Sequence, residues 1–258
     1  MNSSNEILRV INLRVSAKPN KLIINNISFN CWGQKFFVIL GKNGQGKTTL
    51  SLSITNLLNK NVFEISGNII IDGTDILSLD ERELTKFRQK KICYIPQNPF
   101  ASFNPTKKIK PQFEEQSKLK EIPFETYIDL MNKLELKNID SILNKYPFEL
   151  SGGILQRLSA VRCFASNPLL IIADEPTSAL DKPISNQLIN LFVDYVSSKK
   201  GTLIFITQDV SIAEKYANRV GLLHQGKMDL ILDKNDFFKT KDNIELKIIL
   251  EAFEQLKV

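Results

Sequence analysis

The sequence is poor in the residues on which most metal sites and many hydrolases depend. Its 258 residues include one histidine, His224, and three cysteines, Cys31, Cys93 and Cys163, with no CxxC pair. A histidine-rich metal site and a histidine-based catalytic triad are therefore both disfavoured. Three widely spaced thiols argue against a disulfide framework and are typical of a chain from a reducing compartment.

Long apolar runs are also missing. No uninterrupted apolar stretch reaches the roughly 18 residues of a membrane span. Residues 1–8 lack the charged start and the apolar run of a signal peptide. With 43% hydrophobic and 24% charged residues, the composition is typical of a soluble globular protein. If the protein works at a membrane, we expect another subunit to hold it there.

The excess of positive charge is mild. The chain has 34 Lys and Arg against 28 Asp and Glu, a net charge of +6, and its pI is about 9.1. A basic surface suits anionic partners such as nucleotides, nucleic acid or a cytoplasmic lipid face. A solvated surface with no specific partner fits the same numbers and is the simpler interpretation. The length is near the upper end for one domain and allows a sizeable core.

Apolar runs and helical periodicity alternate along the chain, which predicts an α/β fold. Strands are expected over 8–15, 22–30, 36–40, 68–72, 92–95, 169–173 and 202–206, with a closing hairpin of 219–224 and 227–232. Helices are expected over 49–58, 184–196 and 244–256. The stretch 107–145 has little strand signal and carries apolar residues at helical spacing, so it predicts a helical insertion.

A glycine-rich segment stands between the apolar strand 36–40 and the first expected helix. It fits the pattern GxxxxGK[ST] and consists of Gly41, Lys42, Asn43, Gly44, Gln45, Gly46, Lys47 and Thr48. Its glycines let successive backbone N–H groups point at phosphate oxygens, and the helix N-terminus adds partial positive charge. Lys47 can reach the β- and γ-phosphates, and the Thr48 hydroxyl can ligate Mg²⁺. We predict that this loop, with Thr49, binds ATP and Mg²⁺.

Two carboxylates follow a second buried strand. Asp174 and Glu175 come directly after the apolar run 169–173. A carboxylate at Asp174 can hold the Mg²⁺ shell through water, and Glu175 can orient or deprotonate the attacking water as the catalytic base. An acidic pair that only caps a helix is the alternative interpretation.

A third motif is similar to a family signature. Residues 150–157 read LSGGILQR, with two glycines after a serine at an expected helix start, and resemble the LSGGQ-type signature of the ABC ATPases. The order of the motifs is also similar. It runs from the glycine-rich segment 41–48, the P-loop, to Gln97 after a strand, the signature, the Asp-Glu pair, and SALD at 178–181, which looks like the family's D-loop.

This resemblance covers essentially the whole chain. It implies a P-loop NTPase of the ABC ATPase type, one domain over 1–258, with a mixed sheet core, an antiparallel β subdomain and a helical subdomain at about 98–165. It also implies that the signature crosses a dimer interface and binds the γ-phosphate held by the partner's P-loop. The implied nucleotide contacts are Gln97, Ser151, Gly152, Gly153, Gln156 and Asp181, and the implied metal-site residues are Thr48, Gln97 and Asp174.

The sequence resembles the peptide and nickel importer ATPases in particular. Residues 95–105, IPQNPFASFNP, look like their Q-loop stretch, and IADEPTSALD and SGGILQR are similar to that group. The resemblance implies an ATP-hydrolysing subunit of a bacterial import complex for peptide, nickel or a metal chelate, peripheral on the cytoplasmic face of the cell membrane. The implied partners are a second ABC ATPase, two transmembrane permease subunits and, indirectly, an extracellular substrate-binding protein, with no nucleic acid. Gln97 would report Mg-ATP to the permeases, and Phe100 and Phe103 either contact them or pack in the core.

The chain departs from the family's pattern at its switch histidine. Gln208, after the strand 202–206, stands where that histidine is expected. Glutamine can donate a hydrogen bond to a γ-phosphate oxygen, but it cannot carry positive charge or shuttle a proton. We therefore expect slow hydrolysis at this chain's own P-loop and favour a heterodimer with a second ATPase.

The chain departs from the family's pattern in two further respects, the adenine contact and the C-terminal cysteines. Ala17 lies near the position where the family stacks an aromatic residue on adenine, and core packing is favoured for Trp32, the only tryptophan. No cysteine follows Cys163, so no iron–sulfur site is implied, and His224 is interpreted as a surface or packing residue beside a turn.

Two other functions stay open. One is a regulatory nucleotide-binding subunit with little ATPase activity of its own, which Gln208 favours and Glu175 disfavours. The other is an ABC protein that acts on DNA or the ribosome, which the basic pI permits. Such proteins usually carry two ATPase domains or long coiled coils, for which 258 residues leave no room.

Overall fold

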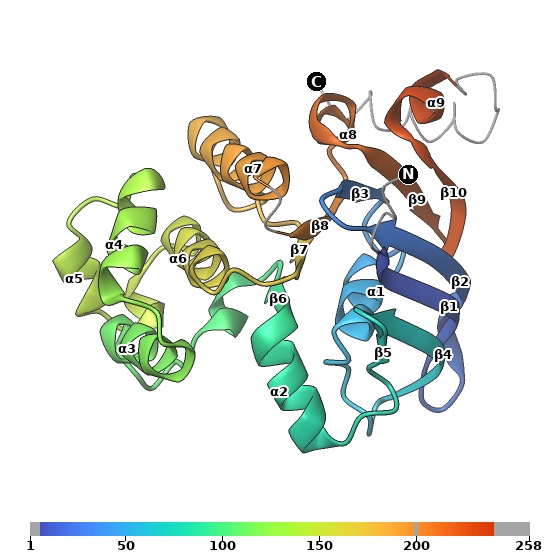
Figure 1. Cartoon of the computed structure of the whole chain (residues 1–258), viewed down its shortest axis with the longest axis horizontal. Coiled ribbons are helices and arrows are strands. Elements are labelled where there is room, and N and C mark those ends of the chain that lie inside the picture. Colours follow the sequence, from blue (N-terminus) through green and yellow to red (C-terminus); the bar gives the residue numbers. More distant parts are fainter. Residues whose placement is uncertain (1–5, 199–200, 240–258) are drawn as a thin grey trace.

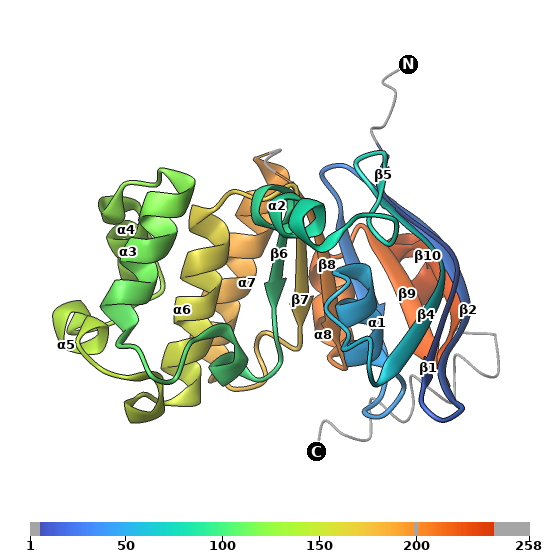
Figure 2. The same ribbon diagram turned by 90° about the horizontal axis from the view of Figure 1, so that it is seen from below.

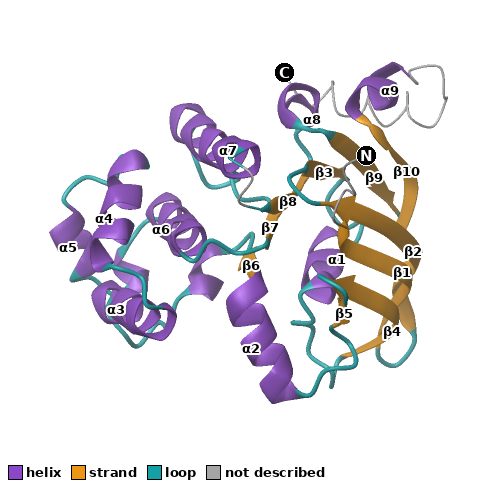
Figure 3. Ribbon diagram, in the orientation of Figure 1, coloured by secondary structure: helices purple, strands orange, loops and turns teal. Residues whose placement is uncertain are grey.

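The computed structural model describes residues 6–198 and 201–239. An antiparallel sheet lies at one end of the molecule and a group of helices at the other, with a second sheet between them (Figure 1, Figure 3). The helix expected over 244–256 lies outside the described residues. Within the described ranges, no helix combines the length and apolar character needed to cross a membrane.

The central sheet has six strands in the order β10-β9-β3-β8-β7-β6. Their bounds are β3 (Phe36–Leu40), β6 (Ile92–Ile95), β7 (Leu170–Asp174), β8 (Thr202–Thr207), β9 (Arg219–His224) and β10 (Lys227–Asp233). All neighbouring pairs are parallel except the hairpin of β9 and β10. The expected mixed sheet is therefore confirmed, and the carboxyl ends of five parallel strands share one edge, where α/β proteins bind ligands.

The second sheet is antiparallel, which confirms the expected β subdomain. It consists of β1 (Glu6–Ala17), β2 (Lys21–Trp32), β4 (Phe63–Ile71) and β5 (Thr74–Asp75) in the order β2-β1-β4-β5. Figure 2 shows helix α1 (Lys47–Ile54) enclosed between the two sheets.

The central strand β3 shows why an unbroken apolar run becomes a buried strand. Successive side chains of a strand point to opposite faces, so a strand covered on both faces needs apolar residues throughout. Phe36, Val38 and Leu40 belong to the core that packs against the helices. Phe37 and Ile39 belong to the core beneath the antiparallel sheet. All five are at most 2% exposed.

Helices and loops alone make up residues 96–169, all of which the structure describes. They are the 3-10 turns η1 (Pro99–Ser102) and η2 (Pro147–Glu149) and the helices α3 (Ile109–Lys120), α4 (Phe124–Lys133), α5 (Ile139–Leu143) and α6 (Gly152–Ala165). The remaining helices are α2 (Glu81–Lys91), α7 (Lys182–Ser197), α8 (Val210–Tyr216) and α9 (Lys234–Lys239). The helical insertion expected from apolar spacing is thus present, with Tyr127 and Met131 buried on α4.

The end of one helix differs from the expectation, and helix α2 was not expected. The first helix was expected over 49–58, but α1 ends at Ile54, because Asn56 takes a left-handed φ of 51° and Thr55 turns its hydroxyl back to the Ser51 carbonyl. Leu57 is consequently 45% exposed rather than part of the helix face. Helix α2 has only one buried residue, Leu84, so it lacks the apolar period that reveals a helix.

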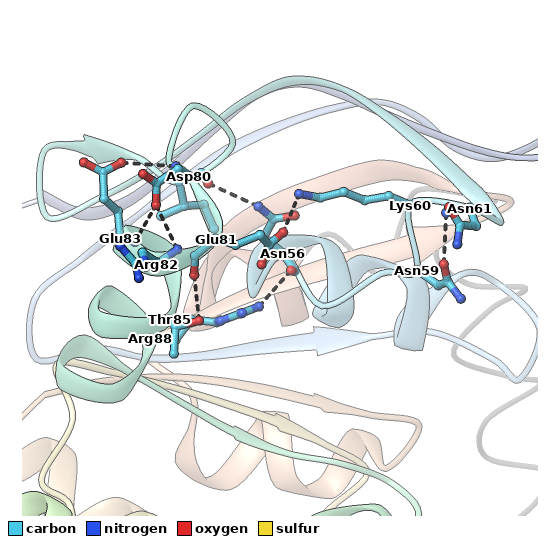
Figure 4. A network of polar contacts seen from close by, with 11 residues as sticks. Asn56, Asn59, Lys60, Asn61, Asp80, Glu81, Arg82, Glu83, Thr85 and Arg88 are labelled. Carbon is cyan, nitrogen blue, oxygen red and sulfur yellow. Dashed lines mark hydrogen bonds and ion pairs between the residues drawn. The ribbon is translucent and has the colours of Figure 1, made fainter.

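A polar network holds α2 against the end of α1 (Figure 4). Asp80 caps α2 by accepting hydrogen bonds from the backbone N–H groups of Arg82 and Glu83, each at 2.8 Å. Arg88 donates to the carbonyl of Asn56 at 2.9 Å, and the Asn56 amide donates to the carbonyl of Ile76 at 3.1 Å. These contacts fix the segment that leads into β6.

Candidate nucleotide-binding site

The glycine-rich loop lies where β3 meets α1, as its sequence predicts. Gly44 and Gly46 have positive φ values of 80° and 98°, which only glycine adopts readily. The loop is anchored to the next strand, because the Gly41 N–H donates to the Thr207 carbonyl at 3.3 Å. It is also held by the β9–β10 turn, where the Gly226 N–H donates to the Gln45 carbonyl at 3.2 Å.

Lys47 is the first residue of α1 and its side chain is only 6% exposed. Its Nζ donates to the Gly41 carbonyl at 2.8 Å and to Asn43 Oδ1 at 3.3 Å. The same ammonium forms an ion pair with Glu175 Oε1 at 3.0 Å. The P-loop lysine and the predicted base are therefore neighbours, and their charges offset each other.

Asp174 is the last residue of β7 and is fully buried. Burial raises the pKa of its carboxyl, and hydrogen bonds from Thr48 and Ser51 and the charge of Lys47 oppose that rise. Ser51 Oγ lies 3.3 Å from Asp174 Oδ2, whereas Asp174 Oδ1 has no hydrogen-bond partner. A buried, unpaired carboxylate oxygen beside the Thr48 hydroxyl is a donor set that suits Mg²⁺ and its water shell.

Glu175 has an unusual backbone conformation, with a left-handed φ of 46°. A non-glycine residue there stores strain, which is typical of functional sites. Its N–H donates to the Ile206 carbonyl at 2.9 Å, and Thr207 Oγ1 donates to its Oε2 at 3.3 Å. These bonds hold the Glu175 carboxylate at the sheet edge beside Lys47.

Gln208 and Gln97 lie at the same edge. Gln208 follows β8, whose last residue Thr207 is paired with Leu40 at the end of β3. Gln97 follows β6, whose Ile95 is paired with Ala173 of β7. Both glutamines are exposed. Strand pairing thus brings residues from four separate parts of the sequence to one edge.

The signature residues begin helix α6. Ser151 is the N-cap, and its Oγ accepts a hydrogen bond from the Ile154 N–H at 3.4 Å. A Cβ on Gly153 would lie 3.2 Å from the Ala179 carbonyl oxygen, so glycine lets α6 approach the loop after Glu175. Asp181 is exposed and caps α7, accepting from the Ile184 N–H at 3.0 Å.

Gln156 differs from the expectation. Its side chain is 1% exposed on the inner face of α6, and neither amide atom has a hydrogen-bond partner. A buried amide cannot reach a nucleotide on a partner's surface, so we leave Gln156 out of the nucleotide contacts.

Three aromatic or histidine positions are now placed. Trp32 ends β2, beyond the end of β3 opposite to the P-loop, and the Arg219 guanidinium lies 4.9 Å from its ring, so it is a packing residue. His224 lies before the β9–β10 turn with Nδ1 at 3.2 Å from Asp229 Oδ2. Ala17 is paired across β1 and β4 with Phe63, an aromatic side chain that sequence reasoning missed because β4 is remote in sequence.

The fold and this site define a P-loop nucleotide-binding protein of the α/β class. The sequence model described as ABC transporter matches residues 24–178. The chain belongs to the ABC transporter family, as one of its ATPase cassettes.

Curated relatives include import proteins. The chain is 35% identical over 212 residues to the metal-staphylopine import system ATP-binding protein CntD of Staphylococcus aureus, covering 80% of this chain and 78% of that protein. It is 30% identical over 220 residues to the oligopeptide transport ATP-binding protein OppD of Lactococcus lactis subsp. cremoris, covering 83% of this chain and 65% of that protein. It is 32% identical over 210 residues to the dipeptide transport ATP-binding protein DppD of Caldanaerobacter subterraneus, covering 79% of this chain and 64% of that protein. The chain therefore spans slightly less than two thirds of these two peptide transport proteins.

A solved structure gives the same fold. A dimeric ATP-binding cassette in a post-hydrolysis state, bound to ADP and Pi, superposes with a TM-score of 0.78 at 25% identity, covering 88% of this chain and 99% of that one.

Proposed function

We propose that this chain is the ATP-binding subunit of an ABC import complex and couples ATP binding and hydrolysis to uptake of peptide, nickel or a metal chelate. The observation that carries the proposal is the convergence of Lys47, Asp174 and Glu175 at the carboxyl edge of the sheet. A P-loop cation, a metal-directed carboxylate and a base in one place constitute an ATP hydrolysis site.

Nucleotide binding changes the contacts that Lys47 makes in the structure. Backbone N–H groups after Gly44 and the amino end of α1 receive phosphate oxygens. Lys47 then turns from Glu175 to the phosphates, and the freed Glu175 carboxylate accepts the proton of the attacking water. Thr48, Asp174 and Gln97 are the residues that would hold Mg²⁺, and the bound metal would supply positive charge to the phosphates.

Gln208 sets the rate at this chain's own site. An exposed amide beside the P-loop can hold a γ-phosphate oxygen, but it neither carries charge nor moves a proton. We propose a slow site on this P-loop and a second site made of Ser151, Gly152 and Gly153 with the P-loop of a different ATPase. Asp181 joins the same interface. A heterodimer therefore suits this chain better than a dimer of two copies.

Peripheral attachment to two permease subunits accounts for the exposed aromatic near Gln97. Phe100 is 44% exposed on η1, whereas Phe103 is 6% exposed and packs in the core. Phe100 is thus the better candidate for a membrane-subunit contact on the cytoplasmic face. The cargo is indirect, because a substrate-binding protein delivers it to the permeases. The relation to a metal-staphylopine import protein supports a metal chelate.

The test is reconstitution. The full chain is co-expressed with the permease and ATPase subunits encoded by neighbouring reading frames. The purified complex is then reconstituted in lipid vesicles. We expect Mg-ATP hydrolysis that rises with the cognate binding protein and its cargo, compared between a metal chelate and a peptide. Glu175→Gln keeps the shape and removes the base, so it is expected to bind ATP and to lose turnover at this site. Failure to recover any membrane subunit, together with recovery of ribosomes or DNA, would overturn the proposal.

A regulatory nucleotide-binding subunit is the second candidate, and Gln208 is the observation that favours it. A single-turnover ATPase assay distinguishes the two. Formation of ADP by the isolated chain supports the enzyme, and ATP retained without ADP supports the regulatory subunit.

A further inference from the structure

Two of the three cysteines meet where the sheet contacts the helical region. Cys93 is on β6 and Cys163 is near the end of α6. Both residues line one cavity of about 200 Å³. These two cysteines are 70 residues apart in the sequence, and no motif predicts that they share a cavity.

The cavity gives one of the thiols access to solutes. Cys163 is fully buried, whereas Cys93 is only partly buried. The cavity shares Gln116, Lys120 and Arg162 with a wider cleft of about 940 Å³ between α2, α3 and α6, so the two spaces adjoin. A small solute in the cleft can therefore approach Cys93 first.

Two cations lie beside this thiol. Lys120 and Arg162 line the same cavity as the two cysteines. Arg162 is fixed by hydrogen bonds to Gln116 Oε1 at 2.9 Å and to the Ser102 carbonyl at 2.7 Å. The described residues that line the smaller cavity include no carboxylate. Cationic, partly exposed surroundings are those of reactive cysteines.

Cys31 provides an internal contrast. It is 1% exposed in the core beneath the antiparallel sheet, and burial raises its pKa to about 12. Burial likewise raises the pKa of Cys163, with Cys93 as a contributing neighbour. Only Cys93 combines access with neighbouring cations.

We propose that Cys93 and Cys163 are a peroxide-reactive thiol pair, in which Cys93 attacks the peroxide and Cys163 resolves the product to a disulfide. The Cys93 thiolate attacks one oxygen of hydrogen peroxide, the O–O bond breaks, and hydroxide leaves with the electron pair and takes a proton to become water. Cys93 is now a sulfenic acid. The Cys163 sulfur attacks it, the S–O bond breaks, and the Cys163 proton leaves with the oxygen as a second water. The two sulfurs lose two electrons and the peroxide gains them.

The disulfide fastens β6 to α6. Strand β6 leads to Gln97, and α6 begins at the Ser151 cap. This consequence rests on the proposed function: fixing the signature helix against the strand of Gln97 hinders their rearrangement, so the oxidised chain hydrolyses ATP more slowly in the assembled complex.

The chemical test uses the reduced full chain and equimolar hydrogen peroxide. We expect intact mass to fall by two hydrogen atoms and a non-reduced digest to contain the Cys93–Cys163 cross-linked peptide. Cys163→Ser is expected to leave a sulfenic acid at Cys93 that dimedone traps, Cys93→Ser to remove the reaction, and Cys31→Ser to leave it unchanged. Lys120→Met is expected to slow it about tenfold. A wild-type digest with no such cross-link, or equal reactivity of Cys31, overturns the pair whether or not the variants fold.

The functional test compares ATPase rates of the complex before oxidation, after oxidation and after dithiothreitol. We expect a loss of more than half of the rate and its recovery, with no change in a Cys93→Ser complex. An unchanged rate on a fully formed disulfide overturns the proposed effect on hydrolysis. A reduced complex without ATPase activity would contradict the proposed function. The result of the disulfide mapping would not be affected by that outcome.

Discussion

The charges at the nucleotide site are arranged for a ligand rather than for stability. Asp174 is fully buried with one unpaired oxygen, and burial raises its pKa, so its ionised form is less stable in the folded chain than in water. A group whose folded pKa is raised destabilises the fold at neutral pH, where the unfolded chain holds the carboxylate at lower free energy.

We therefore predict opposite effects of Asp174→Asn on stability and function. Without nucleotide, the variant melts at a higher temperature at pH 7, and the difference shrinks as the pH falls below the folded pKa, where the wild-type carboxyl is protonated. Mg²⁺-dependent ATP binding falls at least tenfold because the metal shell loses its carboxylate. Calorimetry and ATP titration with and without Mg²⁺ measure both. Asp129→Asn, at an exposed position on α4, is the control and should change neither. A lower melting temperature for Asp174→Asn would contradict this account.

Gln208 gives the second prediction at this scale. Gln208→His restores a side chain that can carry charge and move a proton, so we expect faster hydrolysis in the assembled complex, on the order of 10²-fold at this chain's own site. Gln208→Asn has an amide without the imidazole chemistry and should give no gain. Steady-state ATPase, with the partner's base inactivated so that only this P-loop turns over, isolates the effect. No gain from histidine would count against the slow-site proposal.

At the scale of elements, the start of α6 has two roles that one position can separate. Ser151 caps the helix and is the proposed contact to the partner's γ-phosphate. Ser151→Ala should cost about 1 kcal/mol of unfolding free energy and weaken ATP-dependent association. Ser151→Asp keeps a good cap and places negative charge where phosphate binds. We expect its stability to match the wild type while ATP-dependent association disappears, as measured by denaturant unfolding and analytical ultracentrifugation.

The capping box of α2 supplies the matching stability prediction. Asp80→Ala removes two hydrogen bonds to the backbone of α2, which should cost about 1 kcal/mol. Asp80 belongs to the network in Figure 4 and not to the nucleotide site. ATPase activity of the folded variant should therefore stay at the wild-type level. If the variant is fully folded but loses ATPase activity, α2 must help to position the nucleotide site.

The elements also show what a single sequence can reveal. The runs at β3, β7 and β8 were predicted because strands covered on both faces need unbroken apolar residues. Helix α2 was missed because it buries only Leu84, although Asp80 and Glu83 form a capping box that the sequence displays. The end of α1 was misplaced because Asn56 and Thr55 stop the helix, whereas Leu57 and Leu58 continue its apolar pattern.

At the scale of the whole molecule, the β9–β10 turn supports the P-loop from a distance in sequence. Gly226 has a φ of 73°, and a Cβ there would lie 2.0 Å from the Ile23 carbonyl oxygen. Its carbonyl accepts from the Asn25 N–H at 2.8 Å, and its N–H donates to Gln45 of the P-loop. The Gln225 N–H also donates to Gln45 Oε1. The antiparallel sheet, the hairpin and the P-loop are thus joined at one glycine.

We predict that Gly226→Ala weakens ATP binding and destabilises the fold by about 1–3 kcal/mol or more, because the turn must move away from Ile23 and Gln45. Gly73→Ala is the matched control, with a φ of 77° and no atom within 4 Å of the new Cβ. It carries the backbone strain alone and should leave ATP affinity unchanged. If ATP titration gives the same affinity for both variants, the β9–β10 turn does not support the P-loop.

Contacts between distant segments decide how much of the site the sequence could predict. The P-loop, Asp174 and Glu175 were predicted because each motif carries its own chemistry and follows a recognisable strand. The Lys47–Glu175 ion pair, the Gly226 support and the cavity shared by Cys93 and Cys163 were not predicted, because each joins segments more than 65 residues apart through the packing of the fold. The burial of Gln156 was likewise not predicted, because it depends on what α6 packs against.

The position of β3 in the sheet has a consequence for synthesis of the chain. Both of its hydrogen-bonded neighbours, β8 and β9, begin at or after residue 202, although β3 itself ends at residue 40. During translation, this apolar strand has neither partner until β8 has left the ribosome, since non-local parallel pairing forms late. We therefore expect ATP not to stabilise nascent chains that end before about residue 207, because their P-loop lacks the neighbouring strand β8. Until β8 and β9 are synthesised, protection of this apolar segment has to come from something other than strand pairing.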